Sequence, residues 1–418
     1  MGVDAIVLTL AGIVGLYMAA NIGANDLANA MGTSVGSGAL TLKQAVVISI
    51  VANLLGAVLA GGHVTNTISK GMINPALLAG APDKFMLGMF AALLAGGIWV
   101  HLATVLGLPV STTHSIVGAV VGFGILSVGF GAISWGKVIA IAVSWVVSPV
   151  AGAVIAGTIY YLIRQRILES DSPETVAMRW APSLIGFVLV VIILSFLFKG
   201  LKNLHLDLGF GHALLIALPC GAGGGLVGGL WLRSLLYRWE SQEDTQYFTS
   251  PLQAFFAYLQ VLTASYVAFA HGANDVANAI GPLAAIFSVV KTKSVAMQVE
   301  VPIWMLAIGG IAVGGGLLAF GTRVMETIGG KITELTPVRG FCAQFGAATT
   351  ILVCSRLGLP VSTTHVLVGA VVGVGFMRGM GFLDMRLLRN IGSSWVITLP
   401  FTMVLAIVLY KLLTLFFL

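Results

Sequence analysis

The chain has few charged residues. Asp, Glu, Lys and Arg together make up 9% of its 418 residues and hydrophobic residues make up 58%, whereas about a quarter of a soluble domain is charged. This composition excludes a soluble enzyme. At about 20 residues for each crossing helix, the length leaves room for about ten to twelve spans and for little mass outside the bilayer. We therefore expect an all-α polytopic membrane protein of the cell (inner) membrane.

Cysteine is also scarce. Cys220, Cys342 and Cys354 stand alone in apolar segments, without the spacing of a metal or redox motif, so we expect packing residues and no disulfide framework. The formal net charge is +6. In a membrane protein a basic balance is typical of loops that face the cytoplasm and anionic lipid, so it does not indicate nucleic-acid binding.

Two motifs each occur twice. GANDLANAMG at 23–32 returns as GANDVANAIG at 272–281, with eight of ten positions identical. GLPVSTTHSIVGAVVGFG at 107–124 returns as GLPVSTTHVLVGAVVGVG at 358–375, with fifteen of eighteen identical. The copies are displaced by 249 and 251 residues, so order and spacing are both duplicated. This pattern predicts two structural repeats.

A different kind of segment separates the repeats. Charged stretches at 164–180 and 233–250 flank two apolar runs near 182–198 and 212–232. We expect the runs to form a helical hairpin, and the five arginines of the flanking stretches predict that both stretches lie in the cytoplasm. The chain then divides into a first transmembrane repeat, a linker with two helices and a second repeat, at 1–163, 164–250 and 251–418.

The motifs coincide with interruptions of apolar runs. Pro109 and Pro360 each divide such a run, and proline ends or kinks a helix. Gly-Ala-Asn-Asp also interrupts an apolar run, after Ile22 and again after His271. We therefore predict broken or re-entrant helices at membrane depth in both halves, with the two halves related as inverted repeats. Such helices in corresponding positions are typical of the binding site of a transporter.

Two acidic residues lie inside these apolar segments, at equivalent positions of the repeat: Asp26 and Asp275. An ionised carboxylate there costs several kcal/mol unless it is paired or solvated. One interpretation is that each aspartate only caps a half-helix. The asparagines around both aspartates favour a cluster of oxygen ligands instead, and hard oxygens suit a hard cation such as sodium. The predicted sodium ligands are Asp26, Asn29, Asp275 and Asn278.

The second motif predicts an anion site. Ser111–Thr113 and Ser362–Thr364 follow the proline breaks and precede apolar runs, where a helix N-cap belongs. Free N–H groups, hydroxyls and the positive end of the helix dipole bind anions, although the hydroxyls could also serve only as caps. Neither motif contains Lys or Arg. A bound anion would therefore be neutralised by cations and helix ends, with His114 and His365 in supporting positions.

These paired motifs, in this order and in a polytopic chain of this size, resemble the PiT family of inorganic phosphate transporters. The resemblance covers the whole chain apart from the linker. It implies about twelve spans, alternating access, a homodimer and import of inorganic phosphate with sodium or, in some bacterial members, with protons and a metal–phosphate complex. It implies no cofactor. The phosphate ligands that it implies are Ser111, Thr112, Thr113, Ser362, Thr363, Thr364, Asn25 and Asn274.

One departure from the family concerns the coupling ion. Animal relatives that use sodium carry two glutamates where this chain has Asn53 and Gln344. We still favour sodium, because oxygen clusters occur in both repeats and a phosphate dianion needs more than one compensating cation. Proton coupling and transport of sulfate remain alternatives. A passive anion channel has no use for paired carboxylates, and one catalytic site of an intramembrane phosphatase does not explain two copies.

Overall fold

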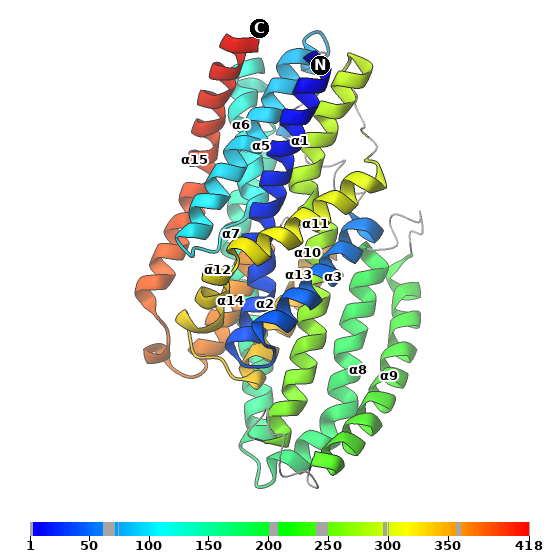
Figure 1. Cartoon of the computed structure of the whole chain (residues 1–418). Helices are drawn as coiled ribbons and strands as arrows, with labels where there is room; N and C mark the ends of the chain where they lie inside the picture. Colours follow the sequence, from blue (N-terminus) through cyan, green and yellow to red (C-terminus); the bar gives the residue numbers. More distant parts are fainter. Residues whose placement is uncertain are drawn as a thin grey trace.

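The computed structural model describes residues 3–61, 72–73, 75–199, 208–239, 250–295, 299, 301–356 and 361–417. Within these residues nine helical segments are long and apolar enough to cross a membrane, and two shorter apolar helices cover Thr112–Val128 and Thr363–Phe376. An isolated β-bridge joins Ile73 to Ile133. The expected all-α polytopic architecture is confirmed (Figure 1).

The first half and the linker contain the following elements. The helices of the first half are α1 (Val3–Ile22), α2 (Ala28–Gly36), α3 (Leu42–Ala60), α5 (Pro82–Val105), α6 (Thr112–Val128) and α7 (Trp135–Ile163). Short 3₁₀ turns cover Pro75–Leu78 (η2) and Phe130–Ala132 (η3), and π-helical turns cover Gly23–Leu27 (η1) and Arg164–Leu168 (η4). The linker forms α8 (Pro173–Lys199) and α9 (Phe210–Trp239), which pack against each other. The loop at 200–207 and the charged residues 240–249 lie outside the described residues.

The second half repeats this order. Its elements are α10 (Pro251–Thr292), α11 (Ile303–Phe320), α12 (Thr322–Glu326), η6 (Thr327–Lys331), α13 (Pro337–Arg356), α14 (Thr363–Phe376), η7 (Met380–Phe382) and α15 (Met385–Phe417). The two GAND motifs, residues 23–32 and 272–281, therefore lie on η1 and α2 and on α10. The two STTH motifs, Ser111–His114 and Ser362–His365, begin α6 and α14.

The predicted interruption at Gly-Ala-Asn-Asp is wrong. The first copy forms the π turn η1, which joins α1 to α2, and the second copy lies within the uninterrupted 42-residue helix α10. The motif contains no proline, and its glycines serve close packing. A Cβ atom on Gly23 would lie 1.7 Å from the Val313 carbonyl oxygen, and one on Gly272 would lie 1.9 Å from that of Asn53.

The predicted break at Gly-Leu-Pro is confirmed in the first half. Helix α5 ends at Val105, α6 begins at Thr112, and Pro109 lies in the connection. Gly107 has a φ of +68°, which side chains other than glycine adopt at a cost. In the second half α13 ends at Arg356 and α14 begins at Thr363. Pro360 itself lies outside the described residues.

The repeat-related helices α1 and α10 lie side by side and run in opposite directions (Figure 1). The Lys293 ammonium, just past the end of α10, donates to the Asp4 carboxylate at the start of α1 over 2.7 Å. Nearer the centre, a Cβ on Gly15 of α1 would meet the Leu283 side chain of α10 at 2.9 Å. Helices that correspond in sequence are thus antiparallel in space.

Each half packs its motif helices against the other half. Helices α1 and η1 contact α11 of the second half, and α10 contacts α3 of the first half. In the same way α6 packs on α15 and α14 packs on α7. Glycines allow these approaches, because a Cβ on Gly316 would lie 1.7 Å from the Ala20 carbonyl oxygen, and one on Gly56 would lie 2.0 Å from that of Phe269. The two halves therefore hold each other in place.

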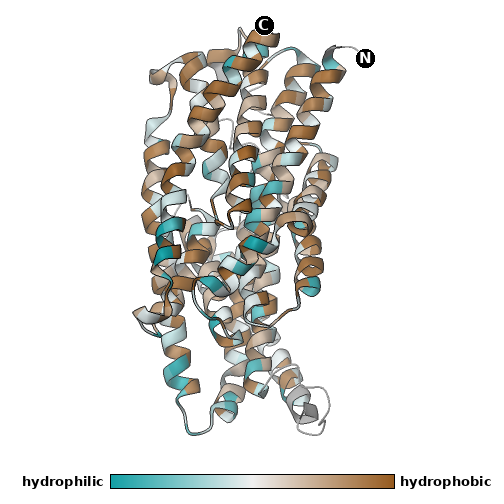
Figure 2. Cartoon of the chain, turned by 60° about the vertical axis from the view of Figure 1, so that its left-hand side comes forward, coloured by the Kyte–Doolittle hydropathy of each residue, from teal (hydrophilic) through white to brown (hydrophobic). Residues whose placement is uncertain are grey.

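The surface of the molecule is apolar over most of its length. Figure 2 shows hydrophobic residues along the outer helices and hydrophilic residues gathered near the middle and at one end. At that end α7 stops, α8 begins, α9 stops and α10 begins, whereas both termini lie at the opposite end (Figure 1). We call these the linker end and the terminal end. Of the cysteines, Cys342 and Cys354 are buried as expected, but Cys220 is exposed on α9, so the packing prediction is wrong for it.

Gly23→Ala tests the close packing between the halves. The added methyl group would overlap the backbone of α11, which does not move as freely as a side chain, so we expect a loss of about 1–3 kcal/mol in stability or more. Gly12→Ala on the same helix is the control, because a Cβ there meets nothing within 4 Å. Thermal unfolding in detergent measures both. Equal melting temperatures for the two variants would refute the packing role of Gly23.

Candidate functional site

The N-termini of α6 and α14 are capped by the first serine of each motif. The Ser111 hydroxyl accepts a hydrogen bond from the His114 amide over 3.3 Å, and Ser362 accepts one from the His365 amide at the same distance. The predicted N-caps are confirmed. Because the serines provide the caps, the threonine hydroxyls that follow them are available for other contacts.

Both capped helices meet at one carboxylate, that of Asp26. The Thr112 hydroxyl donates to Asp26 Oδ2 over 2.5 Å, and the Thr364 hydroxyl donates to Asp26 Oδ1 over 3.0 Å. Asp26 is only 2% exposed. Burial of the carboxylate is costly unless it is hydrogen-bonded or paired, and here the two donors come from opposite halves of the chain. Asp26 therefore links the two STTH motifs.

The asparagines of the GAND motifs complete a reciprocal pattern. Asn29 of the first half donates to the Thr364 hydroxyl of the second half over 3.1 Å. Asn278 of the second half donates to the Thr112 and Thr113 hydroxyls of the first half, each over 3.1 Å. Thr112 and Thr364 thus each lie between an aspartate that accepts and an asparagine that donates. The structure brings these predicted residues together from four separate segments.

The second aspartate has a different partner. Asp275, 5% exposed, is bonded to His271 Nδ1 over 2.5 Å. One potential ligand atom from each of Asp26, Asp275 and His271 lies within 4.8 Å of the others. His271 was missed by sequence reasoning, although it directly precedes the motif and is four residues before Asp275, the spacing that places two side chains on one helix face. The equivalent residue of the first half is Ile22, so the cluster is asymmetric.

Asn25 is bonded to the chain around the proline break. Its amide donates to the Thr104 hydroxyl over 3.1 Å and to the Leu108 carbonyl over 3.0 Å, and its oxygen accepts from the Val110 amide over 3.0 Å. Three hydrogen bonds fix the loop immediately before the α6 N-terminus. The structure therefore assigns Asn25 a positioning contact, and its predicted contact with phosphate stays a prediction. Asn274 is half-buried, and the loop that corresponds to the partner of Asn25 lies outside the described residues.

The supporting residues surround this centre. Asn53 donates to the Gly310 carbonyl of α11 over 3.0 Å, and Gln344 donates to the Ala30 carbonyl of α2. The His114 and His365 rings touch each other, with centroids 5.0 Å apart, and His365 stacks on Trp395. Thr113 and Thr363 are half-buried. The two histidines, one from each half of the chain, therefore contact each other at the starts of α6 and α14.

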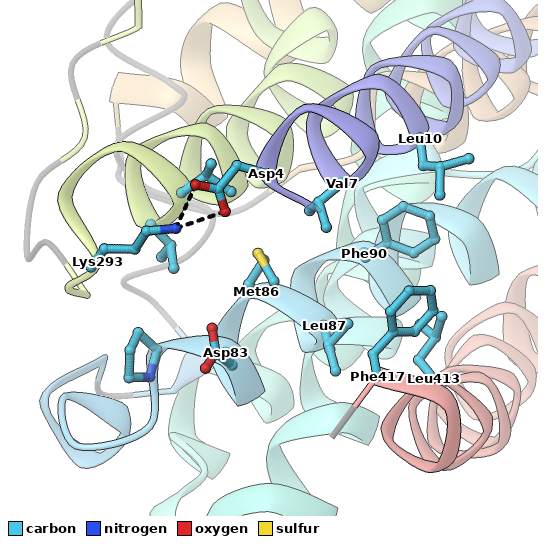
Figure 3. A pocket seen from close by; sticks show the side chains of 13 residues that line it. Asp4, Val7, Leu10, Asp83, Met86, Leu87, Phe90, Lys293, Leu413 and Phe417 are labelled. Atoms are coloured by element: carbon cyan, nitrogen blue, oxygen red, sulfur yellow. Dashed lines mark hydrogen bonds and ion pairs between the residues drawn. The ribbon is translucent and has the colours of Figure 1, made fainter. Parts of the chain in front are cut away.

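A sizeable cavity lies away from this cluster. It has a volume of about 540 Å³ at the terminal end, and Figure 3 shows the Asp4–Lys293 ion pair beside apolar side chains from α1, α5 and α15. Its lining contains none of the motif residues. We therefore base the site on the polar cluster around Asp26 and not on this cavity.

The cluster has the chemistry to hold ions of both signs. Carboxylate and amide oxygens suit a hard cation, whereas hydroxyls and helix N-termini suit an oxyanion. These groups come together inside an apolar, multi-helix protein, between two halves whose helices pack against each other. Fold and site together define a multi-pass membrane transporter.

Comparison with known proteins agrees with this class. Residues 22–406 match the model of the phosphate transporter family. A protein of Pyrococcus abyssi that is named as a candidate phosphate permease is 43% identical over 98% of both chains. The chloroplastic inorganic phosphate transporter 2-1 of Arabidopsis thaliana is 43% identical over 95% of this chain and 70% of its own. A solved structure titled as the sodium-dependent phosphate transporter is 40% identical, covers 98% of this chain and 99% of its own, and superposes with a TM-score of 0.86.

The chain belongs to the phosphate transporter family. It is a phosphate transporter of the PiT type embedded in the membrane, and not an enzyme. The family resemblance drawn from the paired motifs is confirmed.

Thr364→Val tests whether the Asp26 cluster is the transport site. Valine keeps the shape but removes one donor to Asp26 and the acceptor of Asn29, and a hydrogen bond to a charged group is worth about 1.5–3 kcal/mol. We expect the efficiency of phosphate uptake, Vmax/KM, to fall at least about tenfold, with partial recovery in Thr364→Ser. Thr350→Val is the matched control, because that buried hydroxyl bonds only the Gly346 carbonyl of its own helix among the described residues. Wild-type uptake by Thr364→Val would exclude the cluster.

Proposed function

We propose that this protein imports inorganic phosphate by symport with sodium ions and alternates the access of one central site between the two sides of the membrane. One observation carries the proposal: the buried Asp26 carboxylate accepts hydrogen bonds from Thr112 and Thr364, at the starts of two helices of opposite halves. When a cation binds the carboxylate, the same hydroxyls can donate their hydrogen bonds to phosphate oxygens instead. Cation and anion then occupy adjacent parts of one site.

The sodium ions belong to the aspartates in this proposal. Asp26 and Asp275 lie close together and are buried, and two such carboxylates repel each other when both are ionised. A cation between them relieves the repulsion. A third oxygen is provided by Asn29, whose buried amide oxygen has no hydrogen-bond partner among the described residues. Asn278, the equivalent residue of the second half, is the fourth proposed ligand.

The phosphate belongs to the threonines. Thr112 and Thr113 begin α6, Thr363 and Thr364 begin α14, and the partial positive charge of each helix N-terminus adds to their hydroxyl donors. Ser111 and Ser362, which cap these helices, keep an O–H that can also donate to phosphate. Asn25 fixes the loop before α6, and the contact of Asn25 and Asn274 with phosphate stays a prediction. Because neither motif contains Lys or Arg, phosphate depends on sodium for charge compensation.

This dependence makes the protein a symporter. Two ions of opposite charge in one poorly solvated site raise each other's affinity, and linkage requires the effect to be reciprocal. Neither ion alone binds tightly. Sodium offsets part of the negative charge of the aspartates and the phosphate, so the loaded site crosses between states that expose it to opposite sides more readily than a site holding phosphate alone.

Alternating access follows from the arrangement of the halves. We propose that residues 1–163 and 251–418 form inverted repeats, which the antiparallel α1 and α10 and the reciprocal packing of motif helices support. Inverted repeats allow two conformations of similar energy, related by a pseudo-two-fold axis, around a fixed site. A homodimeric assembly stays a prediction, which cross-linking in the membrane tests.

A second candidate is symport with protons or with a metal–phosphate complex. The contact between His271 and Asp275 favours it, because an imidazole can bind a proton or a divalent metal ion as well as orient a carboxylate. We prefer sodium because the remaining ligands around Asp26 are oxygens. The two candidates differ in the gradient that drives uptake.

Uptake of labelled phosphate into proteoliposomes at fixed pH separates these candidates. A sodium gradient is expected to drive phosphate accumulation, and a proton gradient without sodium is not. Uptake that is indifferent to sodium but abolished by collapsing a proton gradient would contradict sodium coupling.

Charge-removing variants test the roles of the aspartates. Asp26→Asn and Asp275→Asn keep the size of the side chain but remove the charge that attracts sodium, so we expect each to lower sodium-driven uptake at least about tenfold. Asp83→Asn is the control, because Asp83 is exposed at the terminal end. Full sodium-driven uptake in both aspartate variants would refute their assigned role.

A further inference from the structure

A group of buried polar residues extends from the transport site toward the linker end. On α2, Ala30 and Ser34 are one helical turn apart and Ser37 follows almost one turn later. The Gln344 amide of α13 donates to the Ala30 carbonyl, and the Ser37 hydroxyl donates to the Gln260 side chain of α10 over 2.8 Å. The three helices α2, α10 and α13 thus meet along this line, which continues the site by about 16 Å from Asp26.

These polar residues have hydrogen-bonding groups that the protein does not use. Ser34, Gln260 and Gln344 are each 0% exposed, yet Ser34 Oγ, Gln260 Nε2 and Gln344 Oε1 have no partner within the part of the chain that the structure describes. The same holds for Thr33 Oγ1. Buried polar groups are normally satisfied, and those left without a partner cost stability. Four such groups lie on the helices of this junction, where water or an ion could provide the missing partners.

The corresponding junction on the terminal side of Asp26 is apolar at the same positions of the repeat. The residues that correspond by the repeat to Ser34, Ser37, Gln260 and Gln344 are Leu283, Ile286, Ala11 and Leu93. Ile286, Ala11 and Leu93 are completely buried in the apolar core. The equivalent junction of α1, α5 and α10 toward the terminal end is therefore apolar at these positions. Of the two corresponding junctions, the one between α2, α10 and α13 carries the polar side chains at the four compared positions.

We propose that the junction of α2, α10 and α13 is the route by which phosphate and sodium leave the site toward the linker end, with Ser34, Gln260 and Gln344 as transient ligands. This inference rests on the proposed symport. The O–H and N–H groups of hydroxyls and amides can donate to phosphate oxygens, and their oxygens can coordinate sodium. The same residues can therefore bind both ions. The unused groups find their partners when the helices separate and ions or water enter. The arginines of the linker predict that this end faces the cytoplasm.

Cysteine accessibility tests the route. The parent is the variant Cys220→Ser, Cys342→Ala, Cys354→Ala, whose phosphate uptake is checked first. Into it we would place Ser34→Cys, the matched Leu283→Cys at the corresponding position of the other half, and Glu169→Cys as an exposed reporter of the linker end. A membrane-impermeant, positively charged thiol reagent is applied from each side of the membrane, with and without sodium plus inorganic phosphate.

The proposal predicts that Ser34→Cys reacts from the same side as Glu169→Cys, and that sodium plus phosphate slows the reaction several-fold. Leu283→Cys is expected to react at least tenfold more slowly from that side. Failure of Ser34→Cys to react from the reporter's side, or equal reaction of Leu283→Cys from that side, would overturn the route. The symport would still stand if sodium drives uptake by the parent, so the two failures can be told apart.

A transport measurement adds a second readout. Gln344→Leu removes the transient ligand at the start of the route, and we expect the maximal uptake rate to fall at least fivefold while the Kd of phosphate for the purified protein changes less than twofold. Gln344→Asn, which keeps the amide, is expected to recover part of the rate. A parallel loss of rate and affinity would place Gln344 in the binding site and contradict its role in release.

Discussion

The structure depends on the burial of a single carboxylate between two copies of one motif. Asp26 is removed from water, and Thr112 and Thr364 provide the hydrogen bonds that replace it. A buried carboxylate that loses one of its donors keeps its charge with fewer hydrogen bonds to stabilise it, which costs more than a lost contact at the surface. The starts of α6 and α14 are therefore held together inside the protein, where an anion can use both helix N-termini.

The packing of the halves maintains this geometry. The glycines of the GAND motifs and of α3 and α11 bring backbones into direct contact across the repeats, while Asn25 fixes the loop before α6. The serines cap the helices, so the threonines are free to bind. In the two motifs the glycines thus allow close approach, the asparagine fixes a loop, the aspartate provides a charge and the threonines donate from their hydroxyls.

The sequence was sufficient to predict much of this. The scarcity of charge predicts the membrane, the proline predicts the break before α6, and Ser-Thr-Thr predicts a capped helix N-terminus. The GAND motif was misread as a helix break, because a glycine that allows close approach cannot be distinguished by sequence from one that ends a helix. The reciprocal bonds of Asn29 to Thr364 and of Asn278 to Thr112 join segments whose separation in sequence contains no information about contact. His271 was overlooked because the first repeat has Ile22 in its place.

The central claim is that sodium and phosphate share one site in which each raises the affinity of the other. Equilibrium binding of labelled phosphate to the purified protein, measured over a range of sodium concentrations at constant ionic strength and pH, tests it directly. The account predicts that the Kd of phosphate falls steadily as sodium rises, and that phosphate lowers the Kd of sodium by the same factor. A phosphate Kd that does not change with sodium would contradict it.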